Sequence, residues 1–209
     1  MDIVLALMFS SDDRAARLVA AEAAATKAVS LAPESAIAHM CLGLVQVRTN
    51  RASQGVRECE RALELNRNLA DAHGVIGAGK LLLGQAEEAV RHIQEALRLS
   101  PDDTFAYSWC EFAGYAKILL GKDEEAVAWL RRSIVANTNY PSSHIILAAA
   151  LAGLGRLDEA RSEAQAGLTI NPTFTIARFR ARPLSDHPAM VATRRRILDG
   201  LRKAGVPEQ

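Results

Sequence analysis

The sequence predicts an all-α protein in which antiparallel helix pairs stack side by side. The first observation is helical spacing of apolar residues, and one such stripe runs through the second half of the segment 70–103 at Ala89, Val90, Ile93, Ala96 and Leu97. The second is the presence of helix-terminating residues: Gly84 suits the end of the first helix, and Pro101 cannot continue the second one. The third is recurrence of this two-helix pattern along the chain, which indicates an elongated array.

Small residues recur at fixed places in the repeat, and their spacing gives its period. Gly43 and Gly77 are 34 residues apart, as are Ala62 and Ala96. Further along, the spacing is first 37 and then 34 residues, in the series Gly84, Gly121, Gly155 and Ala89, Ala126, Ala160. Small residues are needed at such places because two helices approach closely there. A 34-residue helix–turn–helix repeat with this pattern resembles the tetratricopeptide repeat (TPR).

The resemblance implies a right-handed superhelix of stacked antiparallel helix pairs, closed by a C-terminal capping helix. We expect an N-terminal partial repeat at 1–35, a basic capping region at 175–209, and four hairpins between them, at 36–69, 70–103, 107–140 and 141–174. Three extra residues, Thr104, Phe105 and Ala106, should lengthen the first helix of the third hairpin by almost a turn. The expected first helix, Asp2–Phe9, is short, so the start of the array looks cut from something longer.

The capping helix is expected at Ala189–Lys203. Four apolar side chains should bind the array, and the basic ones should face solvent: Met190, Ile197, Leu198 and Leu201, against Arg194, Arg195, Arg196, Arg202 and Lys203. From Thr173 onward there are eight basic and three acidic residues, an excess that could indicate RNA or DNA contact. No base-stacking aromatic residues interleave with the basic run, so a solvated face of the cap is favoured and nucleic acid is an unlikely partner.

Composition excludes several classes of protein. The formal net charge of the 209 residues is +1, which gives no overall attraction to nucleic acid or to a membrane surface. The apolar start, MDIVLALMF, is too short to span a bilayer, which takes roughly 20 residues, and is a poor signal peptide. The three cysteines, Cys41, Cys59 and Cys110, have no metal-binding spacing and suit a reducing compartment, so we expect a cytoplasmic protein.

Motifs that suggest enzymatic chemistry have simpler structural explanations. Gly74–Lys80 matches the phosphate-binding GxxxxGK pattern, but Leu81 stands where Ser or Thr must hold magnesium, and the segment lies inside a predicted helix. The large aromatic residue usual early in the first TPR helix is replaced by His39, His73 and His144. Successive repeats should hold these histidines about 10 Å apart, so we expect packing rather than a shared metal ion. We therefore expect no catalytic residues, no cofactor and no metal.

Function is then expected from a surface. In stacked helical hairpins the first helices line the concave face, where partners usually lie. The inward-facing positions form a mostly apolar groove: Met40, Leu44, Val47, Val75, Ala78, Leu81, Phe112, Tyr115, Leu119, Ile146 and Ala149. TPR proteins that bind chaperone tails use Lys, Arg and Asn in this groove, and those residue types are missing here. An apolar groove favours a helical or apolar segment of a protein or peptide partner.

Two occupants other than a separate partner remain open. The groove could be filled by the terminal helix of the same chain, or by a second copy in a homo-oligomer. Five of the ten aromatic residues lie between Phe105 and Tyr115, where they either pack beneath the lengthened helix or anchor an interface. Phe112 and Tyr115 are the side chains that we expect to contact a partner.

A second resemblance concerns context. The order of the units, the aromatic insertion before 107–140 and the ending ILDGLRKAGVPE are similar to the C-terminal repeat region of bacterial class III adenylate/guanylate cyclase-like proteins. The resemblance implies a regulatory or partner-sensing arm of a larger signalling protein. The catalytic residues of that family lie in a domain that is absent here, so none is carried over.

Overall fold

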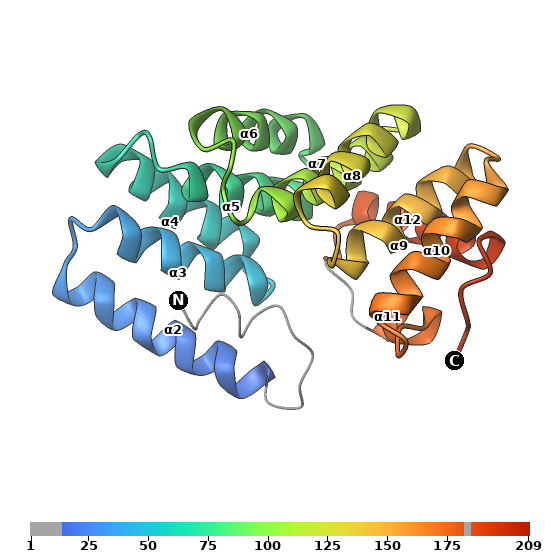
Figure 1. The fold of residues 1–209 in the computed structure, drawn as a ribbon. Helices are drawn as coiled ribbons and strands as arrows, with labels where there is room; N and C mark the ends of the chain where they lie inside the picture. Colours follow the sequence, from blue (N-terminus) through green and yellow to red (C-terminus); the bar gives the residue numbers. More distant parts are fainter. Residues whose placement is uncertain (1–13, 182–184) are drawn as a thin grey trace.

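The computed structural model describes residues 14–181 and 185–209, and within these ranges every regular element is a helix, which confirms the all-α prediction. The expected helix at Asp2–Phe9 lies outside the described residues. The helices, shown in Figure 1, are α2 (Arg14–Leu31), α3 (Ala36–Arg48), α4 (Ala52–Leu65), α5 (Ala70–Leu82), α6 (Ala86–Leu99), α7 (Ala106–Leu119), α8 (Asp123–Ala136), α9 (Pro141–Gly153), α10 (Leu157–Ile170), α11 (Ile176–Ala181) and α12 (Pro188–Lys203).

The helices pack as a stack of hairpins. Helix α3 packs on α4, α5 on α6, α7 on α8 and α9 on α10, and each second helix also packs on the first helix of the next hairpin. Small residues allow the close approach within a hairpin. A Cβ on Gly43 would lie 2.5 Å from Cys59 Sγ, and one on Gly77 would lie 2.7 Å from the Ile93 side chain. Only a residue without a side chain fits these two crossings, which is why glycine recurs there.

A left-handed residue ends the first helix of each hairpin. Gly84, Gly121 and Gly155 have φ values of 76°, 72° and 79°, and Asn50 occupies the same place in the 36–69 hairpin with φ 61°. At Gly84 the amide of Gln85 donates to the carbonyl of Lys80, and the amide of Gly84 donates to that of Leu81. This is the Schellman pattern, in which two otherwise unpaired helix carbonyls accept hydrogen bonds. Turn residues therefore fix where each first helix stops.

The three extra residues lengthen the helix by one residue and not by almost a turn, so that expectation was wrong. Helix α7 has 14 residues and α5 has 13, and α7 begins at Ala106, the last residue of the insertion. Instead, the Asp103 side chain accepts hydrogen bonds from the Ser100 hydroxyl (3.1 Å) and from the amide of Phe105 (2.8 Å). An aspartate that binds the backbone two residues later stabilises a turn, so the insertion is absorbed by the connection.

The C-terminal segment folds back over the array. Helix α12 packs on α9 and α7, and its apolar side chains are buried against them as predicted: Met190, Ile197, Leu198 and Leu201 are 0–8% exposed. Gly200 allows the two backbones to meet, because a Cβ there would lie 2.5 Å from the carbonyl oxygen of Ala149. Figure 1 shows α12 behind α9, and before it Ser185 donates to the carbonyl of Leu82 at the end of α5 (2.6 Å).

Two of the basic residues expected to face solvent, Arg194 and Arg196, also bind other helices of the array. Arg196 donates to the carbonyl of Ile118 (2.7 Å) and forms an ion pair with Asp123 (2.8 Å), the first residue of α8. Arg194 donates to the carbonyl of Phe179 (2.7 Å), and its guanidinium lies 5.7 Å from the centre of that ring. These contacts tie α12 to the α7–α8 turn and to α11.

Candidate partner-binding face

The first helices of the hairpins form one continuous row. Helix α3 contacts α5, α5 contacts α7, and α7 contacts α9; we call these four helices the inner row. Their residues carry the predicted partner-binding positions. The inner row has two halves, since α12 lies on α7 and α9 and leaves α3 and α5 without this cover.

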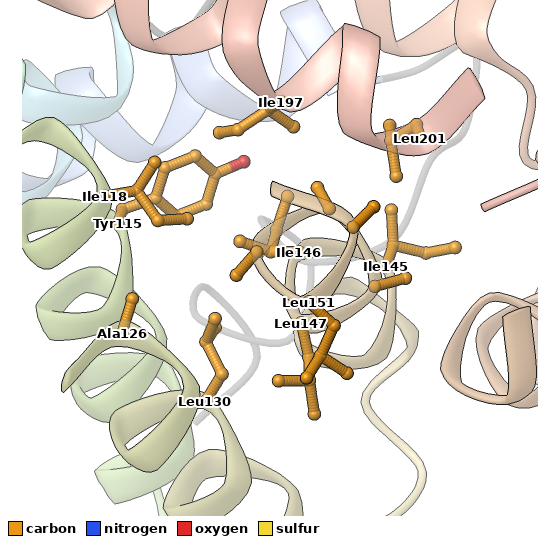
Figure 2. Packing of buried hydrophobic residues seen from close by; sticks show 14 of the residues in the cluster. Tyr115, Ile118, Ala126, Leu130, Ile145, Ile146, Leu147, Leu151, Ile197 and Leu201 are labelled. Carbon is orange, nitrogen blue, oxygen red and sulfur yellow. The ribbon is translucent and has the colours of Figure 1, made fainter. Parts of the chain in front are cut away.

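Beneath α12, the predicted binding residues are buried. Tyr115 is 5% exposed and Ile146 is 1% exposed, and both share one apolar cluster with Ile197 and Leu201 of α12. Figure 2 shows Ile197 above Tyr115 and Ile146, and Leu201 above Ile145. Ala149 is also covered, because Gly200 lies against its backbone. These side chains cannot contact a partner while α12 occupies this position, since the chain itself fills that half of the row.

Four other predicted residues pack within the array. Val47, Val75 and Ala78 are 4%, 8% and 7% exposed and belong to the cluster between α3, α4 and α5. A Cβ on Gly55 would lie 2.6 Å from the Val47 side chain, and one on Gly79 would lie 3.3 Å from it. Val47 therefore fills the junction between two hairpins. Leu81 is fully buried. A helix turns about 100° per residue, so neighbouring positions on the inner helices differ sharply in exposure.

The remaining predicted residues stay partly exposed and lie on common clusters. Met40, Leu44 and Phe112 pack against the α3–α5 cluster, and Leu119 packs against the cluster beneath α12. Ile37, 62% exposed, precedes Met40 by three residues and Leu44 by seven, which is one face of α3. Leu82, at the end of α5, also packs on both clusters. We call this set the apolar strip: Ile37, Met40, Leu44, Leu82, Phe112 and Leu119. Sequence reasoning missed Ile37 and Leu82, although the three- and four-residue spacing from Met40 could have identified Ile37.

A buried acid lies beside the strip. Glu111, which precedes Phe112, is 3% exposed, accepts a hydrogen bond from the Tyr140 hydroxyl (2.9 Å) and also binds the Ser142 hydroxyl. Burial raises the pKa of this carboxyl, because removal from water disfavours the charged form. The network joins α7 to the start of α9. It links two helices of the inner row.

The three predicted histidines each meet a partner 19 residues later, across their hairpin. His39 Nδ1 lies 2.8 Å from Glu58, and His144 Nδ1 lies 2.7 Å from Glu163, whereas His73 meets a second histidine, His92. Burial opposes protonation of His39, but hydrogen bonds to Glu58 and to the carbonyl of Pro33 outweigh it and raise its pKa. The sequence pattern identified only the first residue of each pair, which is the histidine on the first helix of the hairpin. The 19-residue spacing was the signal that could have found the second.

Nothing in the described helices supports the enzymatic motifs. Gly74 to Lys80 lies inside α5, where Gly74 packs on the Trp109 ring and Lys80 forms an ion pair with Glu88 (2.9 Å). Within residues 14–181 and 185–209, no group of three or more His, Cys, Asp or Glu side chains could hold a metal ion. The three cysteines are free thiols. In the same ranges, the helices all lack the length and apolarity needed to cross a membrane.

The features of this fold define an array of the TPR type. They are stacked helix pairs with small residues at their crossings, a left-handed residue at each turn, and a helix that closes one end. The described chain has the TPR fold, and solved structures share it. YrrB, described as a TPR protein with an unusual peptide-binding site, has TM-score 0.58 and 24% identity over 87% of this chain and 90% of its own.

Two further structures extend the comparison. Pseudomonas aeruginosa pilF has TM-score 0.69 and 21% identity over 97% of this chain and 86% of its own. A thermophilic TPR protein from Thermus thermophilus has TM-score 0.66 and 19% identity over 88% and 92% of the two chains. Identities of this size show a common fold. No protein-family model and no curated protein matches the sequence.

Proposed function

We propose that this protein is a non-catalytic scaffold that binds another protein through the apolar strip, and that the partner presents an amphipathic helix. The observation that carries the proposal is α12 itself. It is an amphipathic helix seated on α7 and α9, with Met190, Ile197 and Leu201 buried beneath it. The first half of the same row carries similar apolar side chains without that cover. A surface that buries one amphipathic helix offers the next helix the same kind of apolar contact.

The wider context is also part of the proposal. The resemblance of the chain ending to cyclase-like proteins supports a regulatory arm within a larger bacterial signalling protein, acting in the cytoplasm. YrrB, a structural neighbour, is described as having a peptide-binding site, which fits a peptide or protein partner here. Nucleic acid is less favoured as a partner, because Arg194, Arg196 and Arg202 are engaged by groups of the chain itself.

A second candidate is self-association, in which another copy covers the strip. The observation that favours it is Ile37, a large apolar side chain that is 62% exposed at the edge of the strip. Light scattering over a dilution series separates the two candidates. A monomer at all concentrations supports a separate partner, whereas a dimer that dissociates in an Ile37→Asp variant supports self-association.

The test of partner binding is selection from a displayed library of helical peptides with the full chain as bait. Enriched peptides should be amphipathic helices, and Ile37→Asp should weaken their binding at least tenfold, because a charge then faces the apolar surface of the peptide. The matched control is Val135→Asp on α8, since Val135 is 82% exposed and is not part of the strip. Peptides that are polar throughout, or that bind Ile37→Asp as tightly as the unchanged protein, would contradict the proposal.

A further inference from the structure

The hairpin 70–103 differs from its neighbours at the histidine pair. In hairpins 36–69 and 141–174 a histidine on the first helix faces a carboxylate on the second, Glu58 or Glu163. In 70–103 the carboxylate is replaced by His92, and two imidazole rings face each other. Their Nδ1 atoms are 3.1 Å apart, with ring centres 5.3 Å apart and ring planes tilted by 34°. Two neutral imidazoles share at most one proton in this contact, so a lone pair remains.

The spacing of these two nitrogens is close to that of two ligands on one metal ion. Zinc binds imidazole nitrogen at about 2.0–2.1 Å in tetrahedral geometry, which puts two such nitrogens roughly 3.3 Å apart. To bind one ion, the Nδ1 atoms of His73 and His92 need to separate by only about 0.2 Å, with a tilt of the rings. The proton that the two Nδ1 atoms share then moves to Nε2 of His92, the other tautomer of that imidazole. Both side chains are half-buried, so water can reach the remaining coordination positions.

The surroundings of the pair hold the rings in place. His73 lies on α5 and His92 on α6, and these helices are locked together where Gly77 meets Ile93. Arg67 stands six residues before His73, at the place of Pro33 and Thr138, whose carbonyls meet Nε2 of His39 and His144. The same arrangement at His73 places the ring proton on Nε2 and leaves the Nδ1 lone pair directed at His92, as in protein metal sites.

Three basic side chains near the pair, Arg91, Lys80 and Arg98, disfavour positive charge on the rings, but each of them also contacts a carboxylate. Lys80, a base close to His92, is paired with Glu88 at 2.9 Å, and Arg98 is paired with Glu95 at 2.7 Å. The Glu95 carboxylate also attracts positive charge at His73. Arg91 lies 4.0 Å from Glu88 and shares the same acid.

We propose that His73 and His92 bind one divalent transition-metal ion of the zinc class through their Nδ1 atoms, with water completing its coordination. Two protein ligands make an exchangeable site rather than a structural one, because structural zinc sites use four. The ion cross-links α5 to α6 and so stabilises the hairpin at the centre of the apolar strip. An ion that binds only the folded chain raises the melting temperature with its concentration.

The test is titration of the metal-free full chain with ZnCl2 at neutral pH, followed by calorimetry and by NMR of the histidine rings. All proteins carry Cys41→Ser, which removes the most exposed thiol as a competing ligand. The expected result is one saturable site, with ring shifts at His73 and His92. His92→Gln should lose at least tenfold in affinity and lose the zinc-dependent rise in melting temperature.

The matched control is His144→Gln, which alters the equivalent place in another hairpin and should bind zinc as the parent does. Circular dichroism without zinc confirms that each variant is folded. Absence of a saturable site in the parent would overturn the proposal. Binding that is unchanged in His92→Gln would overturn it too, because the ion would then lie elsewhere. Neither result bears on the peptide selection, so the two proposals fail separately.

Discussion

Gly200 gives the sharpest test of how α12 is attached to the array. In an exposed helix interior, replacing glycine with alanine stabilises the protein by up to about 1 kcal/mol, because alanine favours the helix. At Gly200 a Cβ would lie 2.5 Å from the carbonyl oxygen of Ala149 and 2.9 Å from its Cα. Both atoms belong to the backbone of α9 and cannot rotate away, so α12 must shift.

The magnitude follows from these opposing effects. Overpacking of a well-filled contact costs about 1–3 kcal/mol, and a backbone obstacle puts Gly200→Ala near the upper end. With a helix-propensity gain of about 1 kcal/mol subtracted, the expected net loss is about 2 kcal/mol. The shift also loosens the cover over Tyr115 and Ile146. Hydrogen exchange of the amides in α9 should therefore speed up in the variant.

The matched control is Gly153→Ala at the end of α9, where a Cβ would meet nothing within 4 Å. That variant should be unchanged or stabilised by about 0.5 kcal/mol. Urea unfolding followed by far-ultraviolet circular dichroism measures both, and the midpoints are compared directly because an array need not unfold in one step. If Gly200→Ala is stabilised as Gly153→Ala is, the close contact between α12 and α9 does not exist.

Three further variants test the ion pair, the buried acid and the turn. The raised pKa of His39 means that the pair with Glu58 stabilises the protein fully below the ordinary histidine pKa of about 6.5, and that this stabilisation is lost as the pH rises through the raised value. Glu58→Gln should remove this pH dependence, which is worth about 1 kcal/mol. Urea midpoints measured from pH 5.5 to 8.5 test it. Burial raises the pKa of Glu111, so the parent loses stability as the pH rises above the ordinary pKa of a glutamate. Glu111→Gln should keep the hydrogen bonds to Tyr140 and Ser142 and remove that loss, so the variant should melt at a higher temperature than the parent at pH 8. A lower melting temperature of the variant at pH 8 would contradict the assignment. Asn50 has φ 61°, and Asn50→Ala should cost about 1 kcal/mol in the same urea assay because alanine disfavours this conformation; an unchanged midpoint would argue against the turn as described.

The repeat could be predicted from sequence because its determinants are local. Gly43 and Gly77 are dictated by helix crossings inside one hairpin, and Gly84 and Gly121 by the left-handed end of one helix. Each such signal depends on residues close in the chain and repeats at a fixed period. The insertion was misjudged because its length alone does not decide between a longer helix and a longer turn. That choice depended on Asp103, whose side chain binds the amide of Phe105.

The partner-binding residues were harder to predict because their exposure depends on distant parts of the chain. Tyr115 and Ile146 have the pattern of an inner face, but Ile197 and Leu201, more than 50 residues later, cover them. Periodicity identifies an apolar side of a helix without saying what lies on it. The two halves of the inner row carry similar apolar patterns, and among the described helices α12 packs on α7 and α9 of one half.

The geometry of α12 also defines what a partner helix should look like. Its buried residues follow the spacing i, i+3, i+7, i+8, i+10 and i+11, at Met190, Thr193, Ile197, Leu198, Gly200 and Leu201. Most of these side chains are large, and Gly200 is the small one, at the point where the backbones of α12 and α9 converge. At the half of the row that α12 does not cover, Met40, Leu44 and Phe112 are large and partly exposed. A helix bound there should therefore carry small residues opposite Met40 and Phe112. Selected peptides with alanine or glycine at one position of that spacing would agree with this geometry, and peptides with large side chains at every position would contradict it.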